Sequence, residues 1–364
     1  MHIPILLSLT LAASLTTAHT VLTTLWIDGK NQGDGTCIRM GLNPDRTTFP
    51  ISSLDAQDMA CGLNGNTPVT YTCPASTGSK ITFAFRSWAD DPSRGPIDKS
   101  HVGAISIYLK KLSSPSASAP GGGWFKIFNS GYSLSKKKWS ATTLNDNHGL
   151  LTVSIPSGIP SGSYLVRTEI IALQNYPDPQ VFVNCAQLYI TSSSSTSIPN
   201  SKTVSIPGHL HYSDPGLTYD IYENTPSSSK PYPIPGPKVY FPSSSSSSSS
   251  TSSSSSATGL VPSSCILKNA NWCAKELPDY STENECWKAS DDCWAQVLKC
   301  YDSAPPSGYK GCKLWSERKC DVVQKGCKDG EWNGPKNKGK KVAEEKEISE
   351  PIPGGNLPGV DVGE

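Results

Sequence analysis

The chain has 364 residues, a length typical of two domains, and its formal net charge is only +1. A balanced charge creates no long-range field that could hold nucleic acid or an anionic membrane, so we expect neither as a partner. Thirty glycines and thirty prolines favour a loop-rich β protein over a helical one.

An apolar run at residues 3–15 is followed by the small residues Thr16, Thr17 and Ala18. The run is too short to cross a bilayer and is typical of a secretory signal. We therefore predict a signal peptide at residues 1–18 and a secreted, extracellular mature protein. The 12 cysteines fit this interpretation, because an even number of cysteines outside the cell indicates disulfides.

Cleavage after Ala18 would make His19 the first residue of the mature chain. A free α-amine and an imidazole on one residue can chelate a metal through two nitrogens, and nitrogen ligands in a plane suit Cu(II). Some residue must come first, however, so this pattern alone also fits chance.

Residues 19–240 contain short strand-like runs separated by Gly, Pro, Ser and Asn. The clearest runs lie at residues 80–86, 104–109, 150–155 and 163–173. Many short strands in a segment of this length predict an all-β fold, an immunoglobulin-like or fibronectin-like β-sandwich with long loops.

A Ser-rich linker at residues 241–264 comes next, in which residues 243–256 are almost pure serine. Such a tract cannot bury a core, so we expect the sandwich to fold independently of the residues C-terminal to it. The charged tail at residues 328–364 is expected to be disordered.

Between linker and tail, residues 265–327 form an eight-cysteine module. So many cysteines predict a small disulfide-rich module, with 105 possible pairings that spacing does not choose between. Its four tryptophans could form either the small core of the module or a platform that stacks on sugars. The cysteines are Cys265, Cys273, Cys286, Cys293, Cys300, Cys312, Cys320 and Cys327, and the tryptophans are Trp272, Trp287, Trp294 and Trp315.

Several segments occur in the order seen in one known family. They are an N-terminal His19 before a strand that ends in IDG (27–29), DMAC (58–61), SW (87–88), SHVG (100–103), WFKI (124–127), GSYLVRTEIIAL (162–173), QVFVNC (180–185), DPG (214–216), DIY (220–222) and IPGP (234–237). With these motifs, residues 19–240 resemble the fungal lytic polysaccharide monooxygenases of auxiliary activity family nine, formerly glycoside hydrolase family sixty-one. The resemblance does not extend to the eight-cysteine module.

The resemblance implies one copper ion per chain, held by the amine and a ring nitrogen of His19 and by His101. Phe182 occupies the axial position, where the family has a tyrosine, and it cannot ligate the metal. Gln180 is implied as a hydrogen-bonding residue beside the metal. Gln174 stands where the family has a histidine; an amide can still donate a hydrogen bond but does not titrate near neutral pH.

The resemblance also implies that Tyr222 lies on the flat face beside the metal, where it could stack on a sugar, although a buried tyrosine is an equal alternative. Cys61 and Cys185 match a family disulfide, which leaves Cys37 and Cys73 as the other pair of the sandwich. Neither bridge is expected to have a catalytic role.

The resulting hypothesis is a monomeric, copper-dependent monooxygenase that oxidises crystalline cellulose or a related β-glucan at C1 and/or C4, with an external electron donor. The first alternative is a secreted copper-binding protein of the same fold with weak or no oxidative activity, motivated by Gln174 and Phe182. A glycoside hydrolase would need two suitably placed carboxylates, for which Asp90, Asp91 and Glu169 are the available candidates.

Overall fold

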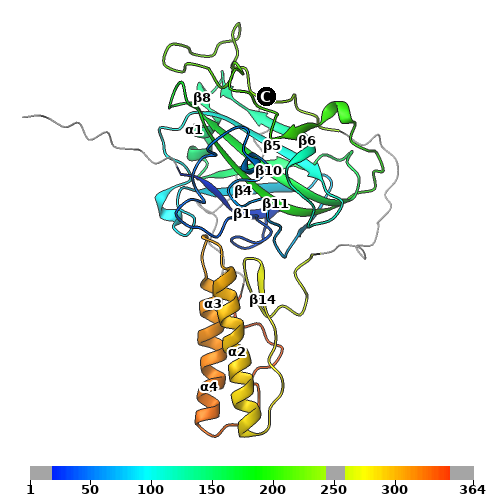
Figure 1. Cartoon of the computed structure of the whole chain (residues 1–364), viewed down its shortest axis with the longest axis vertical. Coiled ribbons are helices and arrows are strands. Elements are labelled where there is room, and N and C mark those ends of the chain that lie inside the picture. The colour runs from blue at the N-terminus through cyan, green and yellow to red at the C-terminus, as the bar shows by residue number, and fades with distance from the viewer. Residues whose placement is uncertain (1–18, 243–258, 345–364) are drawn as a thin grey trace, which may run out of the picture.

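The computed structural model describes residues 19–242 and 259–344. The signal peptide predicted at residues 1–18 lies outside the described residues, as do the serine tract and the end of the tail. Within the described residues, the chain forms a β-sandwich from which a helical module projects (Figure 1).

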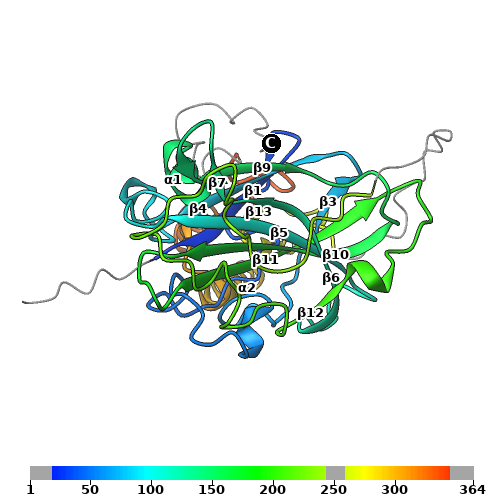
Figure 2. The same cartoon turned by 90° about the horizontal axis from the view of Figure 1, so that it is seen from above.

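Two sheets form the sandwich, one with the strand order β2-β1-β4-β9 and the other with the order β12-β6-β5-β10-β11-β3. Neighbouring strands are antiparallel except β11 and β3, which are parallel. Figure 2 shows the two layers from above. The predicted all-β sandwich with a disulfide-rich C-terminal module is confirmed.

The elements of the sandwich are mostly strands of three to twelve residues. They are β1 (Val21–Ile27), β2 (Lys30–Asn31), β3 (Cys73–Ser76), β4 (Lys80–Arg86), β5 (Gly103–Lys111), β6 (Gly121–Ser130), β7 (Tyr132–Ser133), β8 (Lys138–Trp139), β9 (Leu150–Ser154), β10 (Gly162–Ala172), β11 (Gln180–Thr191) and β12 (Val204–Ile206), with the helix α1 (Ser140–Asp146) and the 3-10 turns η1 (Gln57–Met59), η2 (Pro92–Arg94) and η3 (Asn200–Lys202).

The central strand β10 is buried on both of its faces, because side chains alternate across a strand. Tyr164, Val166 and Ile170 belong to the core between the two sheets. Leu165 and Ile171 belong to a second apolar cluster, in which they join loop residues on the outer face of the larger sheet. The long loops therefore cover this sheet and are held by packing, which lets them position a site.

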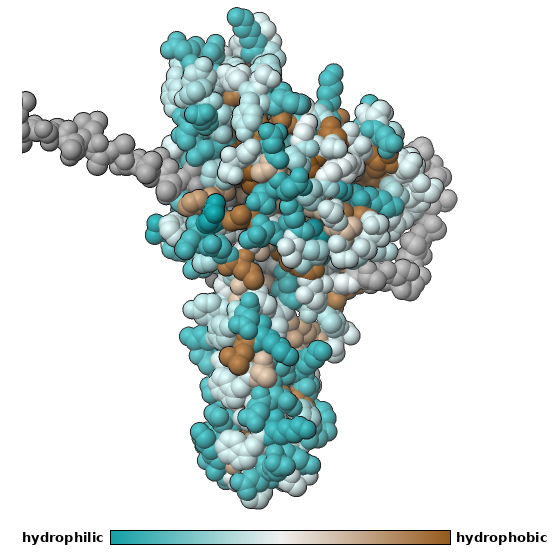
Figure 3. Space-filling view, viewed as in Figure 1, coloured by the Kyte–Doolittle hydropathy of each residue, from teal (hydrophilic) through white to brown (hydrophobic). Residues whose placement is uncertain are grey.

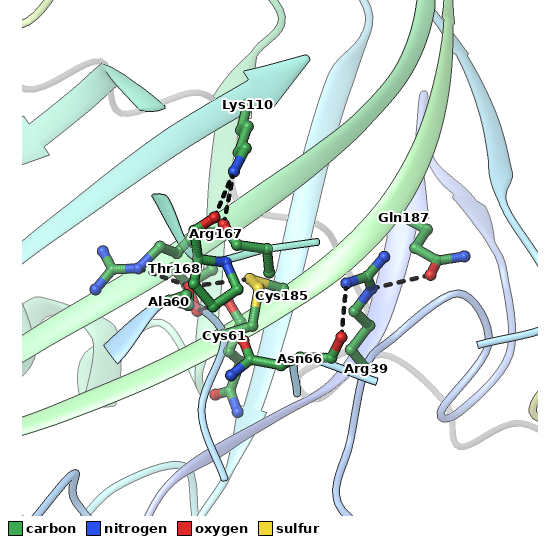
Figure 4. The surroundings of a disulfide bond; sticks show 12 residues. Arg39, Ala60, Cys61, Asn66, Lys110, Arg167, Thr168, Cys185 and Gln187 are labelled. Atoms are coloured by element: carbon green, nitrogen blue, oxygen red, sulfur yellow. Dashed lines mark hydrogen bonds between the residues drawn. A yellow bond between two sulfur atoms is a disulfide. The ribbon is translucent and has the colours of Figure 1, made fainter. Parts of the chain in front are cut away.

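Two disulfides attach loops to the sandwich. Cys37 is bonded to Cys73, and Cys61 is bonded to Cys185 on β11, which are the pairs that the resemblance implies. Beside the second bridge, the guanidinium of Arg167 donates to the carbonyl oxygen of Ala60 at 3.1 Å (Figure 4). The turn that carries Cys61 is thus held by a covalent bond and by a buried charged donor.

The eight-cysteine module is mainly helical, which the sequence analysis did not predict. Cysteines seven residues apart lie on one face of the long helix α2, and three disulfides join this face to a second, antiparallel helical arm. A fourth disulfide closes a small hairpin. The elements are β13 (Leu267–Asn269), β14 (Trp272–Ala274), α2 (Glu283–Ser303), α3 (Lys310–Trp315), the π-helical turn η4 (Ser316–Cys320) and α4 (Asp321–Lys328), and the bridges are Cys265–Cys273, Cys286–Cys327, Cys293–Cys320 and Cys300–Cys312.

The ordered module extends beyond its last cysteine, so the prediction that disorder begins at residue 328 is wrong. Gly334 exchanges two backbone hydrogen bonds with Tyr280, both at 3.0 Å. Further along, the N–H of Val342 donates to the carbonyl oxygen of Ile266 at 3.2 Å. These backbone bonds hold residues 329–342 against the rest of the module.

The module also contacts the sandwich, contrary to the expectation that the two are independent. The side chain of Asn271 accepts from the N–H of Cys37 at 3.0 Å and donates to the carbonyl oxygen of Gly35 at 2.9 Å. The hydroxyl of Thr36 donates to the carbonyl oxygen of Ala270. Gly35 has a φ of +70°, and a Cβ at this position would lie 2.7 Å from Pro305, so glycine permits the close approach.

Candidate active site

The two candidate ligand histidines lie at the ends of strands. His19 lies two residues before the start of β1, and His101 lies in the turn before β5. Asp98 fixes this turn, because its carboxylate accepts from the N–H and the hydroxyl of Ser100 at 2.8 and 2.6 Å. The carbonyl oxygen of Asp98 accepts from the N–H of His101 at 3.0 Å, which holds the histidine backbone in place.

Aromatic side chains surround both imidazoles. The His19 ring meets Phe49 edge-on with centroids 4.8 Å apart, and it stacks on Trp88 at 5.7 Å. His101 is buried, and its ring lies 5.8 Å from that of Phe182, which is also buried. Phe182 therefore lies next to His101 and has no atom that could ligate a metal.

The electrostatics of His101 favour the neutral imidazole, which is the form that binds metals. Burial lowers its pKa, and the nearby charge of His19 lowers it further. These effects outweigh Asp98 and Gln180, which raise the pKa. The charge of His19 is among the groups that act on the pKa of His101, so the two imidazoles lie in the same part of the molecule.

His101 Nε2 is buried and has no hydrogen-bond partner among the described residues. An unpaired buried nitrogen is costly, and a metal ion would provide its missing partner. In residues 19–242 and 259–344, no three side chains of His, Cys, Asp or Glu gather into a metal site. A copper site here therefore needs a third nitrogen, and the α-amine of His19 is the donor that cleavage after Ala18 would create.

Two glutamines meet beside the histidines. Gln174 follows β10 and Gln180 begins β11, so the connection between these paired strands brings them together. Gln174 Nε2 donates to Gln180 Oε1 at 2.9 Å, and Gln174 Oε1 is buried with no partner among the described residues. Since Gln180 is also close enough to affect the pKa of His101, the two amides form one polar group next to the metal position.

Tyr222 lies on the surface next to this group. Its side chain is 69% exposed, which excludes the alternative of a buried tyrosine. Its hydroxyl donates to the backbone carbonyl of Gln174 at 2.7 Å, which fixes the ring near the amide pair. An exposed and anchored aromatic ring is suited to contact a flat substrate.

Two of the three carboxylates considered for hydrolysis, Glu169 and Asp91, have structural roles. Glu169 is fully buried and lies 2.8 Å from both Arg167 and His209. Burial alone would raise its pKa, but Arg167 and His209 lower the pKa well below its usual range, so the group stays ionised. Asp91 caps the turn η2 by accepting from Ser93. Glu169 is thus sealed away from any substrate and has no role in hydrolysis.

The sequence analysis assigned no role to Trp88 or Phe49, although both contact His19. Trp88 is 46% exposed and follows β4, which pairs with β1 so that Arg86 lies opposite Val21. A residue just after β4 must therefore lie beside a residue just before β1. The antiparallel pairing of these two strands is the signal that would have placed Trp88 next to His19.

Comparison with known proteins agrees with this geometry. The sequence model of "Auxiliary Activity family 9 (formerly GH61)" matches residues 19–232. The chain belongs to this family. It is therefore a lytic polysaccharide monooxygenase, an oxidoreductase from a family of secreted fungal copper enzymes.

Two curated relatives resemble nearly the whole chain. The AA9 family lytic polysaccharide monooxygenase C of Aspergillus tamarii is 44% identical over 347 residues, which are 92% of each chain. The AA9 family lytic polysaccharide monooxygenase H of Botryotinia fuckeliana (strain B05.10) is 42% identical over 89% of this chain and 76% of its own. With such coverage, the likeness extends beyond the sandwich into the helical module.

Among solved structures, "CvAA9A" is 31% identical, with a TM-score of 0.54, over 61% of this chain and 98% of its own. The structure titled "Crystal structure of HiLPMO9B" covers 62% of this chain and all of its own at 24% identity and a TM-score of 0.50, which supports the fold. None of the described helices has the length and apolarity needed to cross a membrane.

Proposed function

We propose that the secreted mature protein begins at His19 and binds one copper ion. The ligands are the α-amine and a ring nitrogen of His19 together with His101. The observation that carries this proposal is the buried Nε2 of His101, for which residues 19–242 and 259–344 offer no hydrogen-bond partner. Three nitrogen donors suit copper, and a bound copper ion would supply one-electron redox chemistry and the activation of oxygen, for which an external electron donor is required.

The substrate that we propose is crystalline cellulose or a related β-glucan, oxidised at C1 and/or C4. Support comes from exposed rings: Phe49 and Trp88, which contact His19, are 42% and 46% exposed, and Tyr222, which is bonded to Gln174, is 69% exposed. Aromatic rings on an open surface can stack on the sugars of a polymer that cannot enter a pocket. The protein acts as a monomer.

The chain's own polar groups then have distinct roles. Gln180 and Gln174 hold each other at 2.9 Å and offer amide hydrogen bonds at the metal position, but neither can deliver a proton as an imidazolium would. Phe182 is buried with its ring 5.8 Å from that of His101, and it would offer no ligand atom to a metal held there. The hydrogen bond from the Tyr222 hydroxyl to the backbone carbonyl of Gln174 holds the tyrosine ring in position to contact the substrate.

Mass spectrometry of products from cellulose tests the proposal, with copper-loaded mature protein and with or without ascorbate. We expect oxidised oligosaccharides only when the reductant is present. Products without oxidised ends would overturn the proposal. Tight copper binding with no oxidised product would instead establish the alternative of a copper-binding protein with weak or no activity.

A variant that retains Ala18 in front of His19 tests the ligand set. The amine of His19 is then an amide and cannot bind copper, so we expect tight binding to be lost. His101→Ala is the matched change on the other ligand. Unchanged copper affinity in either protein would show that the site lies elsewhere.

A further inference from the structure

One flank of helix α2 carries aromatic side chains at regular intervals. Trp287, Trp294 and Tyr301 each follow one of the disulfide cysteines and recur every seven residues. Seven residues are close to two helical turns, so these rings lie in one line about 10.5 Å apart. We call these three residues the aromatic strip.

The residues of the strip are less buried than the centre of the module's core. Trp315 is fully buried, and Trp272 packs against it with ring centroids 6.4 Å apart. Trp287 and Trp294 are only half-buried, and Tyr301 is 40% exposed. Trp287 and Trp294, like Trp272, pack against the core with part of the ring and leave another part accessible to solvent.

Neighbouring groups extend this surface. Leu298 lies on the same flank and is 66% exposed, and the ring of Tyr309, 56% exposed, lies 5.4 Å from that of Tyr301. The face of the module that is visible in Figure 3 is largely hydrophilic. The strip thus runs along α2 to the end of the module that meets the sandwich, over about 21 Å from Trp287 to Tyr301.

The opposite flank of α2 is used for internal contacts. Gln296 accepts from the N–H of Lys275 at 2.8 Å and donates to the carbonyl oxygen of the same residue at 3.1 Å. These bonds attach the segment before α2 to that flank. The two sides of the helix therefore differ: one is covered by the chain itself, and the other presents aromatic rings to solvent.

We propose that the aromatic strip binds the face of an extended β-1,4-linked glucan chain. Such a chain presents the same sugar face at every second unit, and the interval between rings on α2 is close to the length of two sugar units. Tryptophan and tyrosine offer flat faces that stack on the C–H groups of pyranose rings, which aliphatic side chains do not. The exposed carboxylate of Asp291, one turn from both Trp287 and Trp294, can accept hydrogen bonds from sugar hydroxyls.

This inference rests on the proposed function for its choice of polymer, but the strip is separate from the copper site. The contacts of Asn271 and Thr36 hold the module against the sandwich. A glucan held on the strip would therefore keep the sandwich close to the same polysaccharide surface.

Depletion of the full-length protein onto microcrystalline cellulose tests the strip, with copper removed by a chelator and no reductant present. We expect the double variant Trp287→Ala/Trp294→Ala to bind at least about fivefold more weakly than the parent, as for the loss of a central contact. Tyr301→Ala should weaken binding to a smaller extent. Lys288→Ala/Lys299→Ala, on the other side of α2, should leave binding unchanged.

Three further results decide the inference. Trp287→Tyr/Trp294→Tyr should retain most of the binding, because stacking needs an aromatic ring, and this variant also shows that loss of binding is not loss of folding. An effect of Leu298→Ala equal to that of the double alanine variant would overturn the inference in favour of general apolar contact. Equal binding by the parent and the double alanine variant, or a parent dimer that this variant abolishes, would also overturn it.

The outcome is independent of the chemistry at His19. If the protein releases no oxidised products, the proposed function is contradicted. A measured difference in cellulose binding between the parent and the strip variants would still support the inference about the strip. Normal oxidation by a protein whose strip variants bind cellulose unchanged would contradict the strip alone.

Discussion

The sandwich and the module are stabilised in different ways. The sandwich buries two extended apolar clusters on the two faces of its larger sheet and has two disulfides. The module has one small cluster around Trp315 and four disulfides. A small unit cannot bury enough apolar surface to be stable without cross-links. Because packing stabilises the larger unit, its loops and strand ends are available to carry a site.

Removing one disulfide from each region, with loops of similar length, tests this difference in stabilisation most directly. Cys293–Cys320 and Cys37–Cys73 close loops of 27 and 36 residues, so their entropic contributions are similar, about 3–4 kcal/mol each. We expect Cys293→Ala/Cys320→Ala to unfold much of the module, because its core cannot offset that loss. Hydrogen exchange by mass spectrometry should show α2 losing its protection.

The matched variant Cys37→Ala/Cys73→Ala should lower the melting temperature and leave the sandwich folded at 25 °C. If α2 keeps its protection without Cys293–Cys320, the module does not depend on its cross-links, and the contrast between the two regions fails.

The sandwich also depends on a cluster of buried charged side chains. Glu169 is paired inside the sandwich with Arg167 and His209, and Tyr108 donates to it at 3.2 Å. Its pKa is well below that of an unfolded glutamate, about 4.3, so the unfolded chain binds more protons in acid. The resulting stability is present above about pH 4.3 and is lost as the pH falls below it.

Glu169→Gln should therefore reduce the stability of the sandwich near neutral pH by about 3–5 kcal/mol, because Arg167 is left with an unpaired buried charge. It should also flatten the loss of stability between about pH 4.3 and pH 3. Chemical denaturation of the full chain at several pH values measures both effects. Asp146→Asn, which breaks the exposed pair with Lys138, is the control and should change little. An acid dependence equal to that of the parent would show that Glu169 is not the responsible group.

The two regions also differ in what the sequence could predict. The sandwich followed from the alternation of short strands, and the candidate ligands followed from His19 and from the motif around His101. The helices of the module were missed, although Cys286, Cys293 and Cys300 recur every seven residues, the interval that places them on one helical face. Applied to the cysteines, that period would have placed these three on one face of a single helix, although their partners are known only from the structure.

Other features depend on contacts between distant segments and could not be read from local patterns. The stacking of Trp88 on His19 requires the pairing of β4 with β1. The hydrogen bond between Gln174 and Gln180 requires the register of β10 and β11. The docking of Asn271 onto the loop that ends at Cys37 joins residues 234 positions apart.

Gln174→His should raise the rate of oxidation by a change within the sandwich alone. An imidazole can donate a proton near neutral pH, whereas the amide of Gln174 only donates a hydrogen bond. General acid assistance is typically worth about 10²–10⁴-fold, and we expect about tenfold here because Gln180 already supplies part of the polar contact. The measurement is the rate of peroxide-driven product formation, with copper affinity determined in parallel.

Copper affinity should stay the same in Gln174→His, since His19 and His101 are unchanged, and Gln180→Ala should lower activity in either background. The variant's rate should also acquire a dependence on pH between about 5 and 8. Equal rates for parent and variant across this range would mean that the amide hydrogen bond is sufficient.

Asn271→Ala tests how strongly the two regions are coupled, and its effect should be the smallest. The side chain of Asn271 makes two hydrogen bonds to the backbone of residues 35 and 37, and each is worth about 0.5–1.5 kcal/mol. Its loss should increase hydrogen exchange in the loop of residues 32–37 and lower the melting temperature of the full chain by a few degrees.

Asn284→Ala, which changes an exposed asparagine in the first turn of α2, is the matched control and should leave both the exchange and the melting temperature unchanged. A chain that ends at Tyr240 should show the same increase in exchange, because it lacks all of the docking contacts. If the loop is protected equally in all four proteins, the module is only tethered to the sandwich, and the aromatic strip is not held in a fixed position beside it.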